Sequence, residues 1–309
     1  MRTTLVTLLA CLTLACTTAA PTTVPAAAPS PYAEALVAQT SGDGTYAQLG
    51  ELDRLTRENG GNRATPGPGY AAAVDHVATV LRGAGWDVTT PEFGLDGRTY
   101  RNVVAQTRTG DPGRVVMAGA HLDSVEDGPG INDNASGVAT LLEIATRMGG
   151  SPPVTGAVRL AFWGAEEIDF EGSQGYVDGL AERDAIALYL NLDMTASPNP
   201  GYFVQGDGPA TADLVARFAA LGVQADRIDF DGTSDYAPFV DAGIPSGSLL
   251  AGDALDKTPD QARRWGGTAG RVFDACYHTA CDDLRNIDRT ALDRFTDVTA
   301  GSLAALATG

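Results

Sequence analysis

The chain has 309 residues, of which 44% are hydrophobic, and a formal net charge of −18 at pH 7. This length can bury one substantial hydrophobic core, and a surface so acidic repels phosphate backbones, which argues against nucleic-acid binding. No uninterrupted apolar run reaches the roughly 20 residues that a membrane-spanning helix needs, so we expect no transmembrane segment.

The first residues of the chain resemble an export signal. Arg2 provides a positive charge, and an apolar stretch and small residues follow, which predicts a signal peptide over residues 1–20. The sequence around Cys16 also loosely fits a lipoprotein processing site, at which the cysteine would carry a lipid, and we weigh the two alternatives equally. The Thr/Ala/Pro-rich residues 21–40 are expected to form a linker before a folded domain at 41–309. We therefore expect a secreted, extracellular protein, with lipid anchoring to the outer face of the cell membrane as the alternative.

Hydrophobic spacing predicts an alternation of helices and strands along the folded domain. Apolar residues recur at helical spacing over 46–58 and 68–81, whereas 87–93 and 100–106 alternate as in strands near a sheet edge. The continuous apolar run at 114–120 indicates a buried central strand. Further helices are predicted at 134–148, 173–180, 211–221 and 290–306, and further strands at 158–163, 186–192 and 245–250. This order is typical of an α/β protein, a three-layer α/β/α sandwich with a mixed central sheet.

Two cysteines, Cys276 and Cys281, remain once the two in the leader are set aside. In an exported chain, a lone pair this close together favours a local disulfide. The alternative, a pair of zinc ligands, would need two further soft ligands, and the chain has only three histidines and no second cysteine pair outside the leader. We therefore predict a disulfide.

Acidic and imidazole side chains follow directly after three of the predicted buried strands. His121 ends the first, the pair Glu166 and Glu167 follows the second, and Asp193 ends the third. Because open α/β sheets bind ligands at the carboxyl ends of their strands, these groups should converge on one crevice. Asp123, two residues after His121, is placed to accept the free ring N–H of that histidine and so to fix its tautomer.

Five side chains offer ligands for two metal ions that share a bridging carboxylate. We expect His121 and Asp193 to bind one ion, Glu167 and His278 to bind the other, and Asp133 to lie between them. A mixture of imidazole and carboxylate without thiolate suits zinc or a similar divalent ion with an open coordination position. Each motif alone is weak, since a His-x-Asp pair or an acidic pair usually lies on a solvated surface, but their combination is much more specific.

Six segments taken together resemble the secreted bacterial dizinc aminopeptidases of the leucyl-aminopeptidase or aminopeptidase S type. The likeness runs from about residue 49 to near the C-terminus, which is essentially the whole predicted domain. The segments are 118–124 (AGAHLDS), 130–134 (GINDN), 162–167 (FWGAEE), 191–194 (NLDM), 234–239 (SDYAPF) and 276–278 (CYH).

The resemblance implies a phosphorylase/hydrolase-like zinc exopeptidase fold and two Zn²⁺ per chain on the ligands given above. It also implies that Glu166 is the general base for a hydroxide that bridges the metals, and that Tyr277 hydrogen-bonds the substrate carbonyl as it becomes an oxyanion. It supports the bridge between Cys276 and Cys281, and it makes the bond Asp133–Asn134 a candidate for the cis form. The substrate would be the N-terminus of a peptide or protein, and the chain would be a monomer.

The region expected to form the substrate pocket departs from the family pattern. Thr233 and Tyr236 stand where close relatives carry an arginine before the Ser-Asp pair and a histidine after it, and Leu250 stands near the place of an aromatic residue. We expect Thr233, Asp235 and Leu250 to line a roomy apolar pocket that suits Leu, Met or Phe as the first residue of the substrate.

Other interpretations compete with the peptidase. A glutaminyl-cyclase-like zinc acyltransferase shares the fold but uses one zinc, so it need not keep all five ligands. A non-catalytic binding module would usually have lost the base or a ligand, and a carboxypeptidase would require an arginine that we cannot assign. Calcium, which some relatives bind through aspartates resembling Asp293 and Asp297, is not expected, because the matching N-terminal ligands are not evident.

Overall fold

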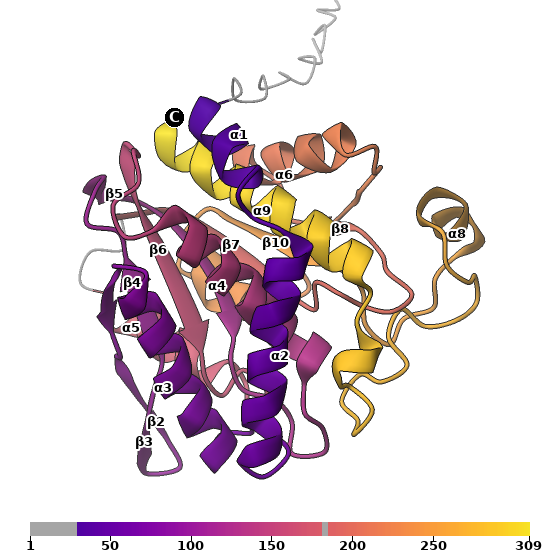
Figure 1. The fold of residues 1–309 in the computed structure, drawn as a ribbon, viewed down its shortest axis with the longest axis horizontal. Helices are drawn as coiled ribbons and strands as arrows, with labels where there is room; N and C mark the ends of the chain where they lie inside the picture. The colour runs from indigo at the N-terminus through magenta and orange to yellow at the C-terminus, as the bar shows by residue number, and fades with distance from the viewer. Residues whose placement is uncertain (1–29, 181–184) are drawn as a thin grey trace, which may run out of the picture.

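The computed structural model of the protein describes residues 30–180 and 185–309. The predicted signal peptide, with its lipidation alternative at Cys16, and residues 21–29 of the predicted linker lie outside the described residues and stay predictions. The described part is built around one large sheet with helices on both of its faces (Figure 1). This architecture confirms the predicted three-layer sandwich.

The central sheet is mixed and has eight strands. They are β1 (Asp87–Thr89), β4 (Val103–Gln106), β5 (Asp111–His121), β6 (Gly156–Trp163), β7 (Ile186–Asp193), β8 (Phe203–Gln205), β9 (Asp226–Ile228) and β10 (Ser246–Leu250). In space they run in the order β1-β4-β6-β5-β7-β10-β8-β9. The central strands β6, β5, β7 and β10 are parallel, whereas β4 and β8 are antiparallel to their inner neighbours. A separate hairpin consists of β2 (Glu92–Leu95) and β3 (Arg98–Arg101).

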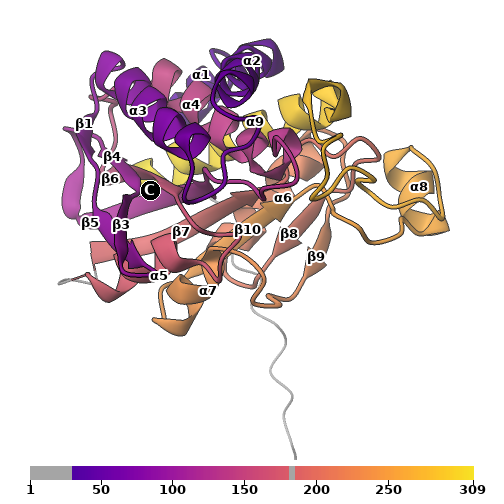
Figure 2. The ribbon, with the colours of Figure 1, turned by 90° about the horizontal axis from the view of Figure 1, so that it is seen from below.

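Helices cover both faces of this sheet, as Figure 2 shows. One layer consists of α1 (Pro31–Val37), α2 (Gly42–Glu58), α3 (Pro68–Gly83), α4 (Ser136–Met148), α6 (Pro209–Ala220) and α9 (Arg289–Thr308). The other face carries α5 (Glu171–Asp178) and α7 (Tyr236–Asp241), and α8 (Pro259–Trp265) lies apart from both layers. Two single-turn elements, η1 (Ile131–Ala135) and η3 (Leu284–Asn286), complete the described chain. Among the described residues, none of the helices combines the length and the hydrophobicity that crossing a bilayer requires.

Strand β5 explains why the centre of the sheet is apolar on both faces. Val116 and Ala118 belong to the core cluster beneath the larger helical layer, whereas Val115 and Met117 belong to the cluster beneath α5 and α7. All four side chains are buried. Because successive side chains of a strand point to opposite faces, a strand that is covered on both sides consists of consecutive apolar residues. That run is the feature that predicted this strand.

The helix predicted at 134–148 begins later than expected, at Ser136. The backbone angles of Asp133 and Asn134, inside η1, are not helical, so the regular helix cannot include them. The peptide bond between these two residues is cis, as the family resemblance predicted. Each of the two predicted edge segments is interrupted by residues outside any strand, at 90–91 and at 102, which gives the short strands β1 to β4 in place of two longer ones.

The linker predicted at 21–40 is wrong in its second half. Helix α1 buries two apolar residues, Ala33 and Leu36, which are 2% and 1% exposed in the core that the helix shares with α9. The side chain of Ser30 caps this helix by accepting a hydrogen bond from the N–H of Ala33, and Pro31 is its first residue. The folded domain therefore begins at about residue 30 rather than at 41, because even this short helix buries an apolar face.

Shortening Leu36 to alanine should destabilise the whole domain. The side chain is almost completely buried, so its loss removes apolar contacts and leaves a cavity, at a cost of about 2–3 kcal/mol. Urea unfolding followed by circular dichroism measures this change, with Glu34→Gln on the exposed face of the same helix as the control. An unchanged free energy of unfolding in Leu36→Ala would show that α1 unfolds separately from the domain.

Candidate metal centre

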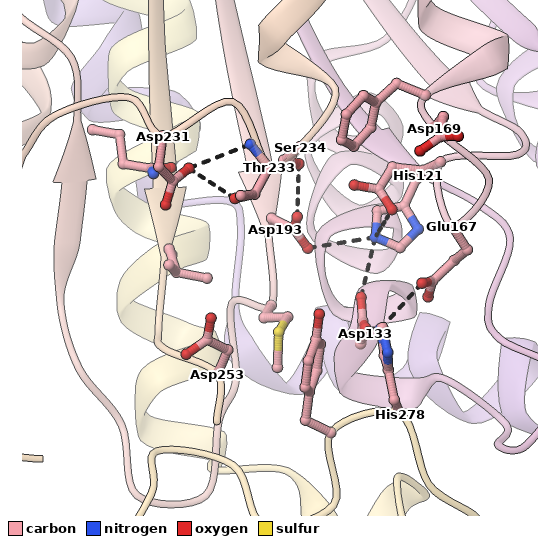
Figure 3. A pocket seen from close by; sticks show the side chains of 16 residues that line it. His121, Asp133, Glu167, Asp169, Asp193, Asp231, Thr233, Ser234, Asp253 and His278 are labelled. Carbon is pink, nitrogen blue, oxygen red and sulfur yellow. Dashed lines mark hydrogen bonds and ion pairs between the residues drawn. The ribbon is translucent and has the colours of Figure 1, made fainter. Parts of the chain in front are cut away.

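Four of the acidic and imidazole side chains lie at one edge of the sheet. His121 ends β5, Asp193 ends β7, and Glu166 and Glu167 follow the end of β6. These three strands are parallel neighbours, so their carboxyl ends meet at the same place. Figure 3 shows the side chains converging on one cavity, whose volume is about 390 Å³.

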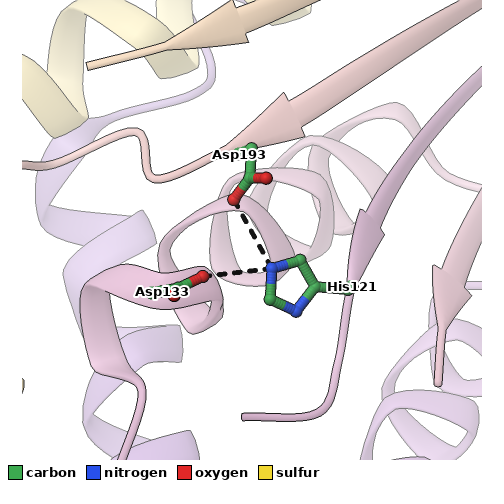
Figure 4. A group of neighbouring side chains, drawn as sticks. All are labelled: His121, Asp133 and Asp193. Carbon is green, nitrogen blue, oxygen red and sulfur yellow. Dashed lines mark ion pairs between the residues drawn. The ribbon is translucent and has the colours of Figure 1, made fainter. Parts of the chain in front are cut away.

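The carboxylate of Asp133 lies between the two histidines of the site. Its Oδ1 is 3.1 Å from Nε2 of His121, and its Oδ2 is 3.1 Å from Nε2 of His278. Nε2 of His121 also lies 3.4 Å from Oδ1 of Asp193 (Figure 4), and Nε2 of His278 lies 3.0 Å from Oε2 of Glu167. The structure thus brings the five predicted ligands together as two groups of three that share Asp133, and the ligand atoms of each group lie within 4.8 Å of one another. His121, Glu166 and Glu167 form a third such group at the same place.

Asp123 lies beside His121 but does not make the predicted contact. Nδ1 of His121 is 3.7 Å from Oδ1 of Asp123, which is too long for a hydrogen bond, and 3.3 Å from the backbone carbonyl oxygen of the same residue. Oδ1 of Asp123 instead accepts the backbone N–H of Glu166 at 3.1 Å. Asp123 therefore connects the end of β5 to the acidic pair that follows β6.

Several buried oxygen atoms of the site have no hydrogen-bond partner among the described residues. They are Oε1 of Glu167, Oδ1 of Asp193 and Oδ2 of Asp123. Leaving buried carboxylate oxygens unpaired is costly, and a divalent cation satisfies such atoms directly. Because imidazole and carboxylate are also the ligands that zinc prefers at catalytic sites, the residues present fit zinc.

The protonation of the site is coupled to metal binding. Hydrogen bonds to Asp133 and Glu167 raise the pKa of His278 to about 10. A histidine must be neutral to bind a metal, so a cation entering here would replace the proton on His278. Burial raises the pKa of Glu166 well above its ordinary value, and a carboxylate of this kind is suited to accept a proton near neutral pH.

Left-handed backbone conformations of residues other than glycine cluster at this site. Ala165, with φ of 53°, precedes the acidic pair, Met194, with φ of 47°, follows Asp193, and His278 itself has φ of 57°. Each such conformation costs on the order of 1–3 kcal/mol and persists only where the surrounding structure imposes it, which is common at functional sites.

Asp282, which the sequence analysis did not single out, holds the loop that carries Asp133. Its Oδ1 accepts the backbone N–H of Asn132 at 2.8 Å, and its Oδ2 accepts the backbone N–H of Asp133 at 3.0 Å. Asn286 donates in turn to Oδ1 of Asp282 at 3.2 Å. The carboxylate of Asp282 therefore fixes the backbone from which the shared ligand projects.

Arg63 is a second buried residue that orders the site. Its guanidinium group donates to the carbonyl oxygens of Leu122 at 2.9 Å and Gly130 at 2.7 Å, and the whole residue is 0% exposed. Leu122 directly follows the ligand His121, and Gly130 precedes η1. The sequence analysis did not single out Arg63, because its partners are backbone carbonyl groups far along the chain.

The predicted substrate-pocket residues are only partly brought together. Thr233, Leu250 and Tyr277 line the cavity, whereas Asp235 is 0% exposed and is not among its lining residues. Asp235 is a buried carboxyl group directly before α7, and a sequence pattern cannot distinguish it from an exposed one. The residue before it, Ser234, lines the cavity and donates to Oδ2 of Asp193 at 2.7 Å.

The predicted disulfide is confirmed and closes the loop that carries two site residues. Cys276 and Cys281 are bonded to each other. Tyr277 and His278 lie within this loop, and their rings are stacked with their centroids 3.8 Å apart. The disulfide therefore restricts the segment that supplies the second histidine and the phenol group.

Replacing Asp235 by asparagine should change how stability depends on pH. Burial raises the pKa of Asp235 to about 8, so between about pH 4 and pH 8 the folded chain holds a proton that the unfolded chain releases. Stability from this group is present at low pH and is lost as the pH rises toward 8. The neutral amide has no such loss, so Asp235→Asn should gain about 2–3 kcal/mol relative to the parent between pH 5 and pH 7.

Urea unfolding of the chelated parent and variant at the two pH values measures this difference. A stability difference between parent and variant that is the same at pH 5 and pH 7 would contradict the assignment of a buried, protonated Asp235.

Comparison with known proteins finds a matching family and similar sequences. The sequence model of "Peptidase family M28" matches residues 102–303. "Leupeptin-inactivating enzyme 1" from Streptomyces exfoliatus is 46% identical over 297 residues, which cover 93% of this chain and 67% of that protein. "Probable lipoprotein aminopeptidase LpqL" from Mycobacterium tuberculosis is 52% identical over 213 residues, which cover 62% of this chain and 42% of that protein. The chain thus spans about two thirds of the first relative's length and less than half of the second's.

Among solved structures, the fold is similar to that of "BSAP, a zinc aminopeptidase from Bacillus subtilis". The TM-score is 0.72 at 16% sequence identity, and the match covers 85% of this chain and 94% of that one. At this identity the likeness supports the fold alone, which agrees with the layers and the sheet described above.

Proposed function

Because the chain belongs to peptidase family M28, as its sequence pattern predicted, we propose that it is a zinc aminopeptidase that removes the first residue of peptides. The observation that carries this proposal is the position of Asp133, whose two oxygens face Nε2 atoms of two different histidines at 3.1 Å each. One carboxylate shared between two imidazole groups is the arrangement that two adjacent cations require.

His121 and Asp193 would hold one zinc ion, Glu167 and His278 the other, and Asp133 both. When bound, the two cations would supply an acidified water and polarise the scissile carbonyl group. A free α-amine of the substrate would bind to the carboxylates of Glu166 and Asp193, which makes the enzyme an exopeptidase.

Glu166 is the proton-handling residue of the proposed reaction. Glu166 is 8% exposed, and its Oε2 lies 3.9 Å from Nε2 of His121. It therefore reaches the reacting region without being one of the five proposed ligands. It would accept the proton of the attacking water and deliver it to the leaving amine. Tyr277 would donate a hydrogen bond from its phenol to the developing oxyanion, and burial raises its pKa, which keeps the phenol protonated.

The lining of the cavity and the disulfide bear on the natural substrate and the location of the enzyme. Leu250 and Met194 line the cavity and favour large apolar first residues such as Leu, Met and Phe. The disulfide and the name of the Mycobacterium relative support an extracellular protein, either secreted or anchored by a lipid at Cys16. We propose that the enzyme acts as a monomer.

Replacing Glu166 by glutamine should abolish hydrolysis while leaving metal binding intact. The amide keeps the shape of the side chain but cannot accept a proton, so kcat for leucine 4-nitroanilide should fall by about 100-fold or more. Bound zinc, measured by mass spectrometry of the dialysed protein, should match that of the parent. Undiminished turnover in Glu166→Gln would remove this residue from its proposed role.

Counting zinc in ligand variants tests whether there are two ions. Asp133→Asn should lose most of both ions because it alters the shared ligand, whereas Glu167→Gln should keep about half of the parent's zinc. Asp169→Asn, which removes a carboxylate that lines the same cavity but belongs to neither group of ligands, is the matched control. A single zinc per chain at full activity would favour the glutaminyl-cyclase-like alternative instead.

A further inference from the structure

One side of the cavity is acidic although none of its carboxylates belongs to the metal centre. Asp231 and Asp253 line the cavity, and Figure 3 shows them on one side of it, with His278 and Glu167 on the other. No lysine or arginine is among the described residues that line the cavity.

The only lysine of the chain does not neutralise this acidic side. Lys257 is buried, and its Nζ donates to the backbone carbonyl oxygen of Gly266 at 2.9 Å. No ion pair of Asp231 or Asp253 with a lysine, arginine or histidine exists among the described residues. The negative charge of both aspartates is therefore available to a ligand in the cavity.

Asp231 is held in place by hydrogen bonds from Thr233 and Tyr236. Its Oδ1 accepts the hydroxyl of Thr233 at 2.7 Å and also the hydroxyl of Tyr236. Partial burial opposes ionisation, but these hydrogen bonds outweigh it and lower the pKa of Asp231, so the group is anionic at neutral pH. No hydrogen bond to its Oδ2 occurs among the described residues, which leaves that oxygen free for a cation.

Asp253 is a half-buried carboxylate with a similar arrangement. Its Oδ1 accepts the backbone N–H of Leu255 at 3.0 Å, and its own carbonyl oxygen accepts the N–H of Asp274 at 2.8 Å. These bonds fix the side chain locally without neutralising its charge.

Leu250 and Met194 line the same cavity and give it an apolar surface beside these charges. A first residue with a long aliphatic stem and a cationic end fits both parts of such a pocket, because the stem packs on apolar side chains while the charge stays near carboxylates. Leucine would use only the apolar part.

We propose that this enzyme releases N-terminal arginine and lysine as well as apolar residues, and that Asp231 and Asp253 bind the cationic end of that first side chain. The inference rests on the proposed aminopeptidase function and adds a second substrate class to the same pocket.

The test compares the 4-nitroanilides of leucine, arginine and citrulline with the zinc-loaded full chain. Citrulline has nearly the shape of arginine without its charge, so the ratio of kcat/KM for arginine over citrulline isolates the electrostatic contribution. We expect this ratio to be about tenfold in the parent, as two partly exposed carboxylates each contribute a modest attraction. It should fall on raising the salt concentration to 0.5 M, because salt screens exposed charges.

Asp231→Asn and Asp253→Asn test the two residues, since asparagine still accepts the hydrogen bonds that hold each side chain. Each variant should lower the ratio of arginine over citrulline, and the double variant should bring it close to one. Asp169→Asn removes a charge of the same kind from the cavity lining, and its ratio should stay at the parent's value. The use of a ratio within each variant cancels any general loss of folded or active enzyme.

The outcomes separate this inference from the proposed function. Absence of turnover for all three substrates in the parent would refute the aminopeptidase itself. Turnover of leucine with a parent ratio near one would refute only the basic specificity. An equal decrease of the arginine-over-citrulline ratio in Asp169→Asn would show that the general charge of the cavity, and not these two aspartates, attracts the substrate.

Discussion

The structure depends on holding one carboxylate, that of Asp133, in a fixed orientation between two histidines that come from distant parts of the chain. Its backbone N–H is bound by Asp282, and the guanidinium group of Arg63 binds the carbonyl that precedes η1. Both supporting residues are buried ionisable groups, which is costly in a protein interior unless their polar atoms are bonded. Arg63 in addition places a positive charge among acidic groups such as Asp123, so the same residue supports the loop and offsets the repulsion between carboxylates.

The parts of the fold that could be predicted are those in which local sequence and burial agree. The central strand over residues 114–120 and the one over 186–192 are covered on both faces, so nearly every residue in them is apolar and the pattern is unambiguous. Once these strands are placed in one parallel set, the positions of His121 and Asp193 at their carboxyl ends follow from topology. The groups of ligands could therefore be predicted from the sequence, because their positions follow from the order of the strands and not from particular side-chain contacts.

The features that were missed depend on partners that the sequence does not identify. The strands β8 and β9 have three residues each, which is too few to show the alternation of apolar and polar residues typical of a strand. They are strands because they pair with the sheet beyond β10. The Ala- and Pro-rich sequence around helix α1 is typical of a linker. The helix is buried because it packs against α9, at the other end of the chain. The roles of Arg63 and Asp282 likewise depend on hydrogen bonds to backbone groups. Because every residue carries such groups, no sequence motif predicts these two roles.

The cavity contains two sets of carboxylates, and their negative charges have different surroundings. Those at the carboxyl ends of the strands lie beside histidines and fit divalent cations, which would cancel much of their charge. Those on the other side form no ion pair with a lysine, arginine or histidine among the described residues, and a hydrogen bond from Tyr236 stabilises the ionised form of Asp231. Thr233 carries no positive charge, so it does not repel a cationic side chain next to this group. The hydroxyl of Thr233 also donates a hydrogen bond to Asp231 that favours the ionised acid, and both features would favour a basic substrate over a neutral one.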